Sequence, residues 1–227
     1  EALTYLGALG GCALVLPELA QSDLYLARAA RALATLESFI AHPPPFLRGY
    51  DFGRARGVAF RLAVLFAGAG QGAEAAYSAV RRLRLSAREA VFARDCVAAG
   101  LQLRDQGDCP PPAPLEVYRY YRAHREAGVD GALLALVQGR ASQDAATGAA
   151  PTLPGLAAQL LRAWFSERAT LVEPPPLLSG REIMAALGLP AGPGVGRLVE
   201  MLREAQVQGL VHTRDEALAH LRQLAGK

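Results

Sequence analysis

The sequence predicts an all-α protein, and three observations support that prediction. Alanine, leucine and arginine, which favour helices, dominate the 227 residues. Apolar residues recur at helical spacing, whereas the sequence contains no convincing alternating strand pattern and no Asn-Gly hairpin. The Ser/Thr-x-x-Glu capping box, which opens helices, occurs at residues 86–89, 179–182 and 213–216.

Helices are predicted in order along the first part of the chain. The first covers residues 2–16, and a second is capped by Ser22 or Asp23 and ended by the prolines at 43–45. The face of the second helix that is expected to point inward carries Leu24, Ala27, Leu33, Leu36 and Ile40. Further helices are expected at 56–68, 73–83, 86–103, 115–128, 128–142 and 156–167, with a loop at 106–114 and a flexible segment at 143–155.

A proline-rich connector at residues 172–180 predicts a boundary between two parts. Residues 1–172 are expected to form a helical body, and residues 173–227 a small helical tail. The tail combines two of the capping boxes with one apolar helical stripe, formed by Val195, Leu198, Val199, Leu202 and Ala205.

The composition is that of a globular protein with a mildly basic charge. The chain is 52% hydrophobic and 20% charged, so it can bury a substantial core. A net charge of +3 is too small for a dedicated polycationic binder. Lys227 is the only lysine. A GC-rich coding bias explains this preference for arginine, which also suits bidentate contact with phosphate.

Cysteine usage and hydropathy predict a cytoplasmic protein that does not enter the membrane. Cys12, Cys96 and Cys109 show no Cys-x-x-Cys or zinc spacing, as in reduced intracellular proteins. The first apolar run stops at Pro17, too early to span a bilayer, and it lacks a basic leader. Because Glu1 falls within a helical pattern, we expect that the chain was cut from a longer polypeptide.

Motifs for catalysis are missing from the sequence. There is no Asp-x-Asp pair to hold magnesium beside a triphosphate, no Walker loop and no Gly-x-Ser-x-Gly elbow. Asp105 and Asp108 beside Cys109 are typical of a turn. The histidines are scattered and lack carboxylates at ligand spacing, namely His42, His124, His212 and His220. We therefore predict neither a catalytic residue nor a metal ligand in this chain.

A glycine corner at the predicted start of a tail helix is a candidate for binding phosphate. Gly192, Gly194 and Gly196 alternate with Pro193 and Val195. Amide groups at a helix start, with no β-carbons nearby, can accept an anion. The pattern resembles helix-hairpin-helix loops that bind a nucleic-acid backbone, although a corner between two helices can also serve only to turn the chain.

Two arginine clusters add candidates for RNA contact. One lies at a helix junction and consists of Arg81, Arg82, Arg84 and Arg88. The other places Arg119, Arg122 and Arg125 on one helix face, interleaved with tyrosines. Arginine and tyrosine together can bind phosphate and stack on unpaired bases. A solvated face over buried aromatic residues is the alternative interpretation.

Residues 174–221 resemble the C-terminal segment of bacterial tRNA nucleotidyltransferases, the family of CCA-adding enzymes and poly(A) polymerases. The resemblance rests on four motifs. They are Pro-Leu-Leu-x-Gly at residues 176–180, a glycine–proline corner at 187–196, Leu-Arg-Glu-Ala-Gln at 202–206 and Thr-Arg-x-Glu-Ala at 213–217. Weaker likeness covers residues 8–19, 81–100 and 116–141, of which the last two resemble helices of the HD-type domain found in some members. The resemblance therefore implies a multi-helix, HD-like body followed by the tail.

The body departs from the pattern of an active HD domain. Phe66 and Ala67 stand where the family has its His-Asp pair, and residues 96–100 lack the later histidine. Val137 and Gln138 stand where a later aspartate is expected. The resemblance thus implies a degenerate HD scaffold without a metal and without phosphohydrolase activity.

The resemblance implies that this chain binds RNA. Catalysis would take place in a head domain that is absent from this chain. The complete protein would add C or A to tRNA 3′ ends from CTP or ATP with magnesium, all bound in that head. The expected partners are the 3′ region of tRNA or another RNA and the protein's own N-terminal head. The residues expected to bind RNA are Arg181, Gly194, Val195, Gly196, Arg197 and Arg203 in the tail, then Arg81, Arg82, Arg84, Arg88, Arg119, Arg122 and Arg125 in the body.

Two alternatives stay open at this point. One is an HD-family, metal-dependent phosphohydrolase acting on nucleotides, which requires a His/Asp cluster. The other is a non-catalytic helical module for dimerisation, which requires no RNA at all.

Overall fold

The structure is a computed structural model that describes residues 10–43, 45–47, 54–104, 112–146 and 155–225. Every regular element in these ranges is helical and no strand occurs among them, which confirms the predicted all-α class. None of the described helices combines the length and the apolar character that crossing a bilayer requires.

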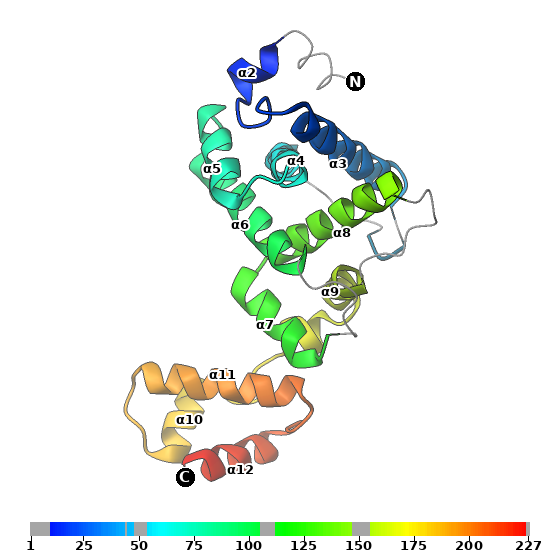
Figure 1. Cartoon of the computed structure of the whole chain (residues 1–227). Helices are drawn as coiled ribbons and strands as arrows, with labels where there is room; N and C mark the ends of the chain where they lie inside the picture. Colours follow the sequence, from blue (N-terminus) through cyan, green and yellow to red (C-terminus); the bar gives the residue numbers. More distant parts are fainter. Residues whose placement is uncertain (1–9, 44, 48–53, 105–111, 147–154, 226–227) are drawn as a thin grey trace.

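The body is a bundle in which α6 and α8 make the most extensive contact among the described helices (Figure 1). Its elements are α2 (Gly11–Val15), α3 (Asp23–Ala41), the 3-10 turn η1 (Pro45–Leu47), α4 (Arg54–Gly68), α5 (Ala73–Arg82), α6 (Ala87–Arg104), α7 (Pro114–His124), α8 (Ala127–Ala146), α9 (Gly155–Ser166) and the π-helical turn η2 (Arg168–Val172). One hydrophobic cluster connects all of these elements except α2, with Phe60, Phe66 and Leu133 fully buried. Because α8 crosses the middle of this cluster, residues 131–138 are buried on every side.

The close crossing of α6 and α8 depends on two glycines. A β-carbon on Gly131 would lie 2.5 Å from the β-carbon of Ala99 and 3.0 Å from the backbone nitrogen of Gly100. A β-carbon on Gly100 would lie 2.5 Å from a methyl group of Leu134. Both positions must therefore lack a side chain for the two backbones to approach this closely.

Three predicted boundaries and one predicted face differ from the structure. Residues 2–9 of the first predicted helix lie outside the described residues, and α2 begins only after Gly10, whose φ of 70° is left-handed. The helix α8 continues through residues 143–146, which were expected to be flexible, because these four residues include no glycine or proline. Arg125, with a φ of 51°, separates α7 from α8.

The predicted inward face of α3 is also shifted. Leu36 is buried as predicted, and Leu33 and Ile40 pack against the core, but Leu24 is 54% exposed and Ala27 is exposed. The buried positions that were not predicted include Ala29 and Ala32. The helix packs through its small residues because α4 lies close to it: a β-carbon on Gly68 would be 2.7 Å from that of Ala32.

The helix α7 separates its two residue types by face. The rings of Tyr118, Tyr120 and Tyr121 are buried, and the hydroxyls of the last two donate to the carbonyl oxygens of Gly128 (2.9 Å) and Leu160 (2.7 Å). Arg119 and Arg122 lie on the exposed side. Aromatic residues therefore attach α7 to the body, and its arginines are left to face the tail.

The tail contains α10 (Gly180–Leu187), α11 (Pro193–Val207) and α12 (Arg214–Ala225) around a second hydrophobic cluster. The buried residues of this cluster are Leu178, Ile183, Leu202, Ala205, Val211, Ala217 and Leu221. The predicted capping boxes form here: the Glu182 carboxylate accepts from the Ser179 amide at 2.7 Å, and that of Glu216 accepts from the Thr213 amide at 3.3 Å. The third box closes in the body, between Ser86 and Glu89.

Candidate nucleic-acid interface

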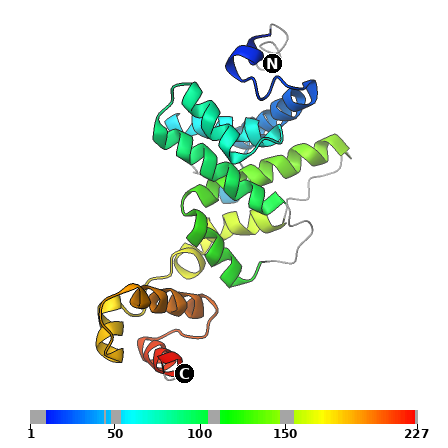
Figure 2. The ribbon, with the colours of Figure 1, turned by 60° about the vertical axis from the view of Figure 1, so that its left-hand side comes forward.

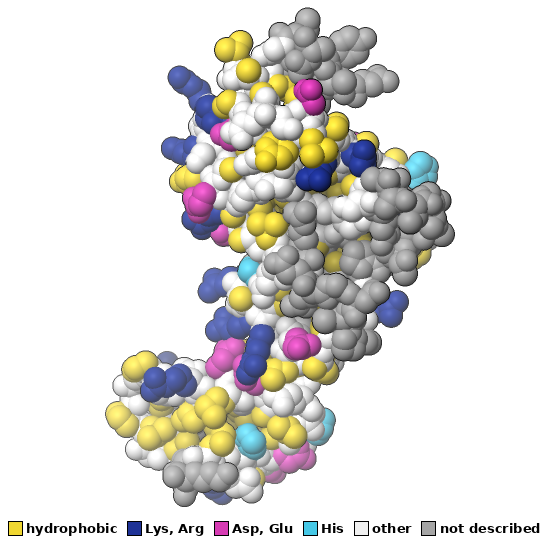
Figure 3. Space-filling model, in the orientation of Figure 1, with side chains coloured by type: hydrophobic (Ala, Val, Ile, Leu, Met, Phe, Trp, Pro, Cys, Tyr) yellow, Lys and Arg dark blue, Asp and Glu magenta, His cyan; other side chains and the backbone are white. Residues whose placement is uncertain are grey.

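The tail contacts the body through α7 and α11, which lie side by side in Figures 1 and 2. Polar side chains make this contact. Arg119 donates to both carboxylate oxygens of Glu204, at 2.8 and 2.7 Å. The Nε of Arg122 donates to Glu200 at 2.9 Å, and the hydroxyl of Tyr118 donates to the same carboxylate at 2.8 Å. Basic and acidic side chains are visible side by side at this junction in Figure 3. Two arginines expected to bind RNA are thus paired with carboxylates of the tail.

The electrostatics of the junction follow from these pairs. The Arg119 guanidinium holds the pKa of the Glu204 carboxyl below its usual range. Burial, and then the hydrogen bond to Glu200, raises the pKa of Tyr118 to about 12. Tyr118 therefore stays protonated near neutral pH and remains a hydrogen-bond donor to the tail. Because Arg119 is 61% and Glu204 25% exposed, solvent and salt screen their attraction.

A cleft of about 520 Å³ opens beside this junction, between α7, α9, the proline connector and α11. Arg122 and Arg125 line it from the body and Arg203 lines it from the tail, together with the carboxylates of Glu126 and Glu173. Trp164 also lines it, with the guanidinium of Arg168 lying 4.3 Å from the centre of its ring. The Nε of Arg203 is buried and has no hydrogen-bond partner. The cleft thus joins three arginines from distant parts of the sequence with an unused donor and an indole ring.

The glycine corner lies at the first turn of α11. Gly192 is extended and provides no side-chain cap, Pro193 occupies the first turn, and β-carbons on Gly194 and Gly196 would meet nothing within 4 Å. Nothing in the described chain therefore requires glycine at those two positions. Val195 differs from its neighbours, because its side chain is buried and its amide donates to the Gly192 carbonyl at 3.1 Å.

The remaining arginines are dispersed. Arg181 on α10 and Arg197 on α11 are exposed. At the junction of α5 and α6, Arg81, Arg84 and Arg88 are exposed as well. Arg82 in the same cluster is paired with Glu18, at 2.8 and 2.7 Å. Figures 1 and 2 place α5 at the opposite end of the molecule from the tail, so this cluster is separate from the cleft.

The described residues contain no group of three or more His, Cys, Asp and Glu side chains that could hold a metal ion. At the positions where the sequence lacks HD ligands, Phe66 and Val137 are buried in the core, whereas Ala67 and Gln138 line a second cavity in the body. Asp105, Asp108 and Cys109 lie outside the described residues.

Sequence reasoning did not identify Glu200, Glu204 and Trp164 as residues of the interface. A signal was present for the two carboxylates. They are four residues apart on one helix, which places them on the same face, and Arg119 and Arg122 are similarly spaced on another. Trp164 carried no such signal, since its position depends on how α9 packs against α7.

Comparison with known proteins gives local matches. No family model matches the sequence, and no solved structure matches it. A CC-adding tRNA nucleotidyltransferase of Thermus thermophilus is 59% identical over 46 residues, or 20% of this chain and 11% of the relative. An A-adding tRNA nucleotidyltransferase of Deinococcus radiodurans is 52% identical over 52 residues, or 23% and 12%. A CC-adding tRNA nucleotidyltransferase of Geobacter sulfurreducens is 37% identical over 111 residues, or 48% and 23%.

These matches support a relation to the tRNA nucleotidyltransferases, over part of the chain. The matched segments span less than a quarter of the length of each of these relatives.

Proposed function

We propose that this chain is the tRNA-binding portion of a tRNA nucleotidyltransferase that adds CC, A or CCA, or of a poly(A) polymerase, whose catalytic head lies outside these residues. The observation that carries the proposal is the identity of 59% and 52% to CC- and A-adding enzymes over 46 and 52 residues. In this proposal residues 1–172 are a degenerate HD-like scaffold, and residues 173–227 are an RNA-binding tail. Magnesium and CTP or ATP belong to the head.

Two features along α11 support RNA contact. The glycine corner offers uncapped amides beside the exposed Arg197, and the cleft offers the guanidinium groups of Arg125 and Arg203. Arg203 follows Gly194 by nine residues, which is about 14 Å along a helix axis. Nine residues also turn the chain by about 180° around that axis, so in this proposal one RNA strand passes around α11 from the corner to the cleft, with its phosphates on the arginines and amides.

Filter binding of a tRNA to the purified chain tests this proposal. We expect Arg197→Ala and Arg203→Ala each to weaken binding several-fold, because each removes a phosphate contact, and binding by the unaltered chain to weaken steeply with salt. Arg222→Ala, an exposed arginine elsewhere in the tail, is the matched control and should leave affinity unchanged. Circular dichroism verifies that the helices persist.

Two outcomes would reject the proposal in different ways. Equal affinity of the unaltered chain and both variants would reject the site, whereas no tRNA binding at all would reject the RNA-binding role. In the second case, a stable dimer in light scattering would favour the dimerisation module. Stoichiometric transition metal in the purified protein would favour the metal-dependent phosphohydrolase.

A further inference from the structure

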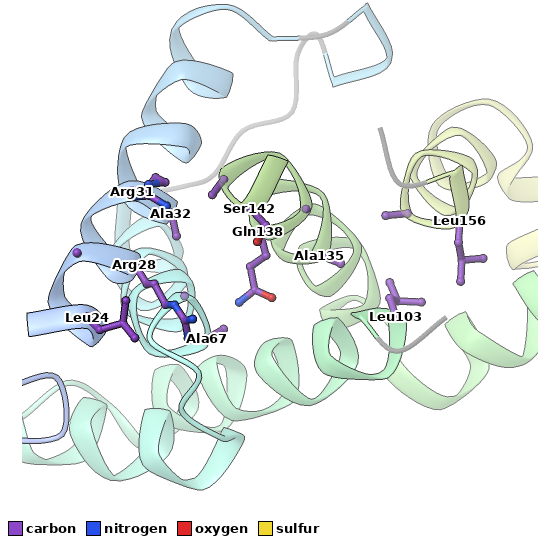
Figure 4. A pocket seen from close by; sticks show the side chains of 15 residues that line it. Leu24, Arg28, Arg31, Ala32, Ala67, Leu103, Ala135, Gln138, Ser142 and Leu156 are labelled. Carbon is purple, nitrogen blue, oxygen red and sulfur yellow. The ribbon is translucent and has the colours of Figure 1, made fainter. Parts of the chain in front are cut away.

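The body contains a cavity of about 600 Å³ between α3, α4, α8 and α9 (Figure 4). Much of its wall is formed by small and aliphatic residues, including Ala32, Ala67, Ala135, Leu103 and Leu156. A volume of this order is typical of sites for small organic molecules. The cavity lies in the body, whereas the cleft beside α11 faces the tail, so the two are separate sites.

Gln138 is the unusual residue of this cavity. Its side chain projects from α8 into the open space (Figure 4), and it is only 9% exposed. Neither its Nε2 nor its Oε1 has a hydrogen-bond partner. A buried amide without partners is destabilising, and native proteins rarely contain one. A ligand that offers one acceptor and one donor side by side would satisfy both atoms.

The mouth of the cavity carries positive charge. Arg28 and Arg31 are exposed and lie three residues apart on α3, so they share the face that borders the opening (Figure 4). The described residues that line the cavity include no acidic side chain. Guanidinium groups in such a setting bind phosphate groups through paired hydrogen bonds.

We propose that this cavity binds a nucleotide, with the base against Gln138 and the phosphate at Arg28 and Arg31. The carboxamide of glutamine pairs with a base edge that presents an acceptor beside a donor, as adenine does. The order of burial sets the direction of binding, since the amide lies deep and the arginines lie at the surface. Apolar walls such as Leu103 and Ala135 contact the faces of the base. The site is independent of the RNA interface proposed above.

Calorimetric titration of the purified chain with AMP, ATP, CMP, adenosine and inorganic phosphate tests this proposal. We expect at least one nucleotide to bind more tightly than adenosine or phosphate alone, because only the nucleotide reaches both ends of the cavity. Gln138→Leu should weaken that binding by about tenfold or more, since it removes both hydrogen bonds to the base. Arg28→Ala should weaken nucleotide binding and leave adenosine binding unchanged.

Two controls separate a binding role from a structural one. Gln138→Leu keeps the side-chain size and removes an unpartnered amide, so its melting temperature without ligand should equal or exceed that of the unaltered chain. Arg162→Ala, an exposed arginine on α9 outside the cavity lining, should bind nucleotide normally. Failure of every nucleotide to bind at millimolar concentration would overturn the proposal, as would equal affinity of the chain and Gln138→Leu.

Discussion

At the scale of single residues, Glu182 connects two helices of the tail. Its carboxylate accepts hydrogen bonds from the amide of Ser179 at 2.7 Å and from its hydroxyl at 2.8 Å, which fixes the first turn of α10. The same carboxylate pairs with Arg214 at the start of α12. The hydrogen bonds from Ser179, and then the contact with Arg214, lower the pKa of Glu182 to about 2.

This lowered pKa predicts acid sensitivity of the tail. The pKa of Glu182 lies near 4.5 in the absence of partners and at about 2 in the folded chain. Its contribution to stability is therefore complete above the higher value and is lost as the pH falls towards the lower one. We expect Glu182→Gln to lower the melting temperature at pH 7 and to flatten its fall between pH 5 and pH 2, measured by circular dichroism.

The matched control is Glu167→Gln, an exposed carboxyl at the end of α9. It should melt with the same pH dependence as the unaltered chain. Identical acid profiles for Glu182→Gln and the unaltered chain would refute the role given to this carboxylate.

The capping contacts could be predicted because both partners lie within four residues of each other. The settings of Gln138 and Arg203 could not be predicted in the same way. Gln138 has no hydrogen-bond partner because α3 and α4 place Ala32 and Ala67 beside it, while Arg28 and Arg31 of α3 lie at the mouth of the cavity. Arg203 borders the cleft only because α11 lies across α7. Such environments arise from residues far apart in the chain, and no local pattern encodes them.

At the scale of elements, the crossing of α6 over α8 is the most sensitive contact of the body. Gly131→Ala would place a methyl group 2.5 Å from the β-carbon of Ala99 and 3.0 Å from a backbone nitrogen. Since backbone atoms cannot move aside like a flexible side chain, the helices must separate. We expect a loss of about 1–3 kcal/mol in the free energy of unfolding, measured with urea.

Gly196→Ala is the matched control on another helix, because a β-carbon there meets nothing within 4 Å. It should be neutral, or stabilising by up to about 1 kcal/mol, since alanine favours helix over glycine. Equal losses at Gly131 and Gly196 would show that the crossing imposes no special constraint. If RNA phosphates approach the backbone at the glycine corner, Gly196→Ala should also weaken tRNA binding without loss of stability.

The helix α7 shows which structural features the spacing of residues in the sequence can predict and which it cannot. Its spacing predicted a helix with Arg119, Arg122 and Arg125 on one face, and the structure has the first two on that face. The prediction was wrong for Arg125, which follows the end of the helix with a φ of 51°. The pattern could not identify what those arginines contact. Their carboxylate partners lie 85 and 78 residues away in the sequence. The element was thus predictable from local residues, whereas its docking depended on the position of the tail.

At the scale of the whole molecule, two hydrophobic clusters are joined through a narrow junction (Figures 1 and 2). The connector, which includes Pro174–Pro176, is one link, and the contact of α7 with α11 is the other. Ion pairs that are partly exposed make much of that contact, and each such pair contributes about 0.2–1 kcal/mol. The tail is therefore held weakly, by arginines that are also candidates for binding RNA.

This arrangement predicts competition between the tail's carboxylates and RNA for the same guanidinium groups. Glu204→Gln removes the charged partner of Arg119 and one negative charge beside the cleft. If RNA phosphates take over Arg119, the unaltered chain must first break the ion pair, whereas the variant need not. We expect Glu204→Gln to raise tRNA affinity about two- to fivefold in low salt, a gain within the free energy of one exposed pair.

Glu37→Gln, which removes the partner of Arg61 from an exposed pair on the body, is the matched control and should leave affinity near that of the unaltered chain. The gain should shrink as salt is added, because salt already weakens the pair in the unaltered chain. A lower affinity for Glu204→Gln than for Glu37→Gln would show instead that the docked position of the tail, and not the release of Arg119, determines RNA binding.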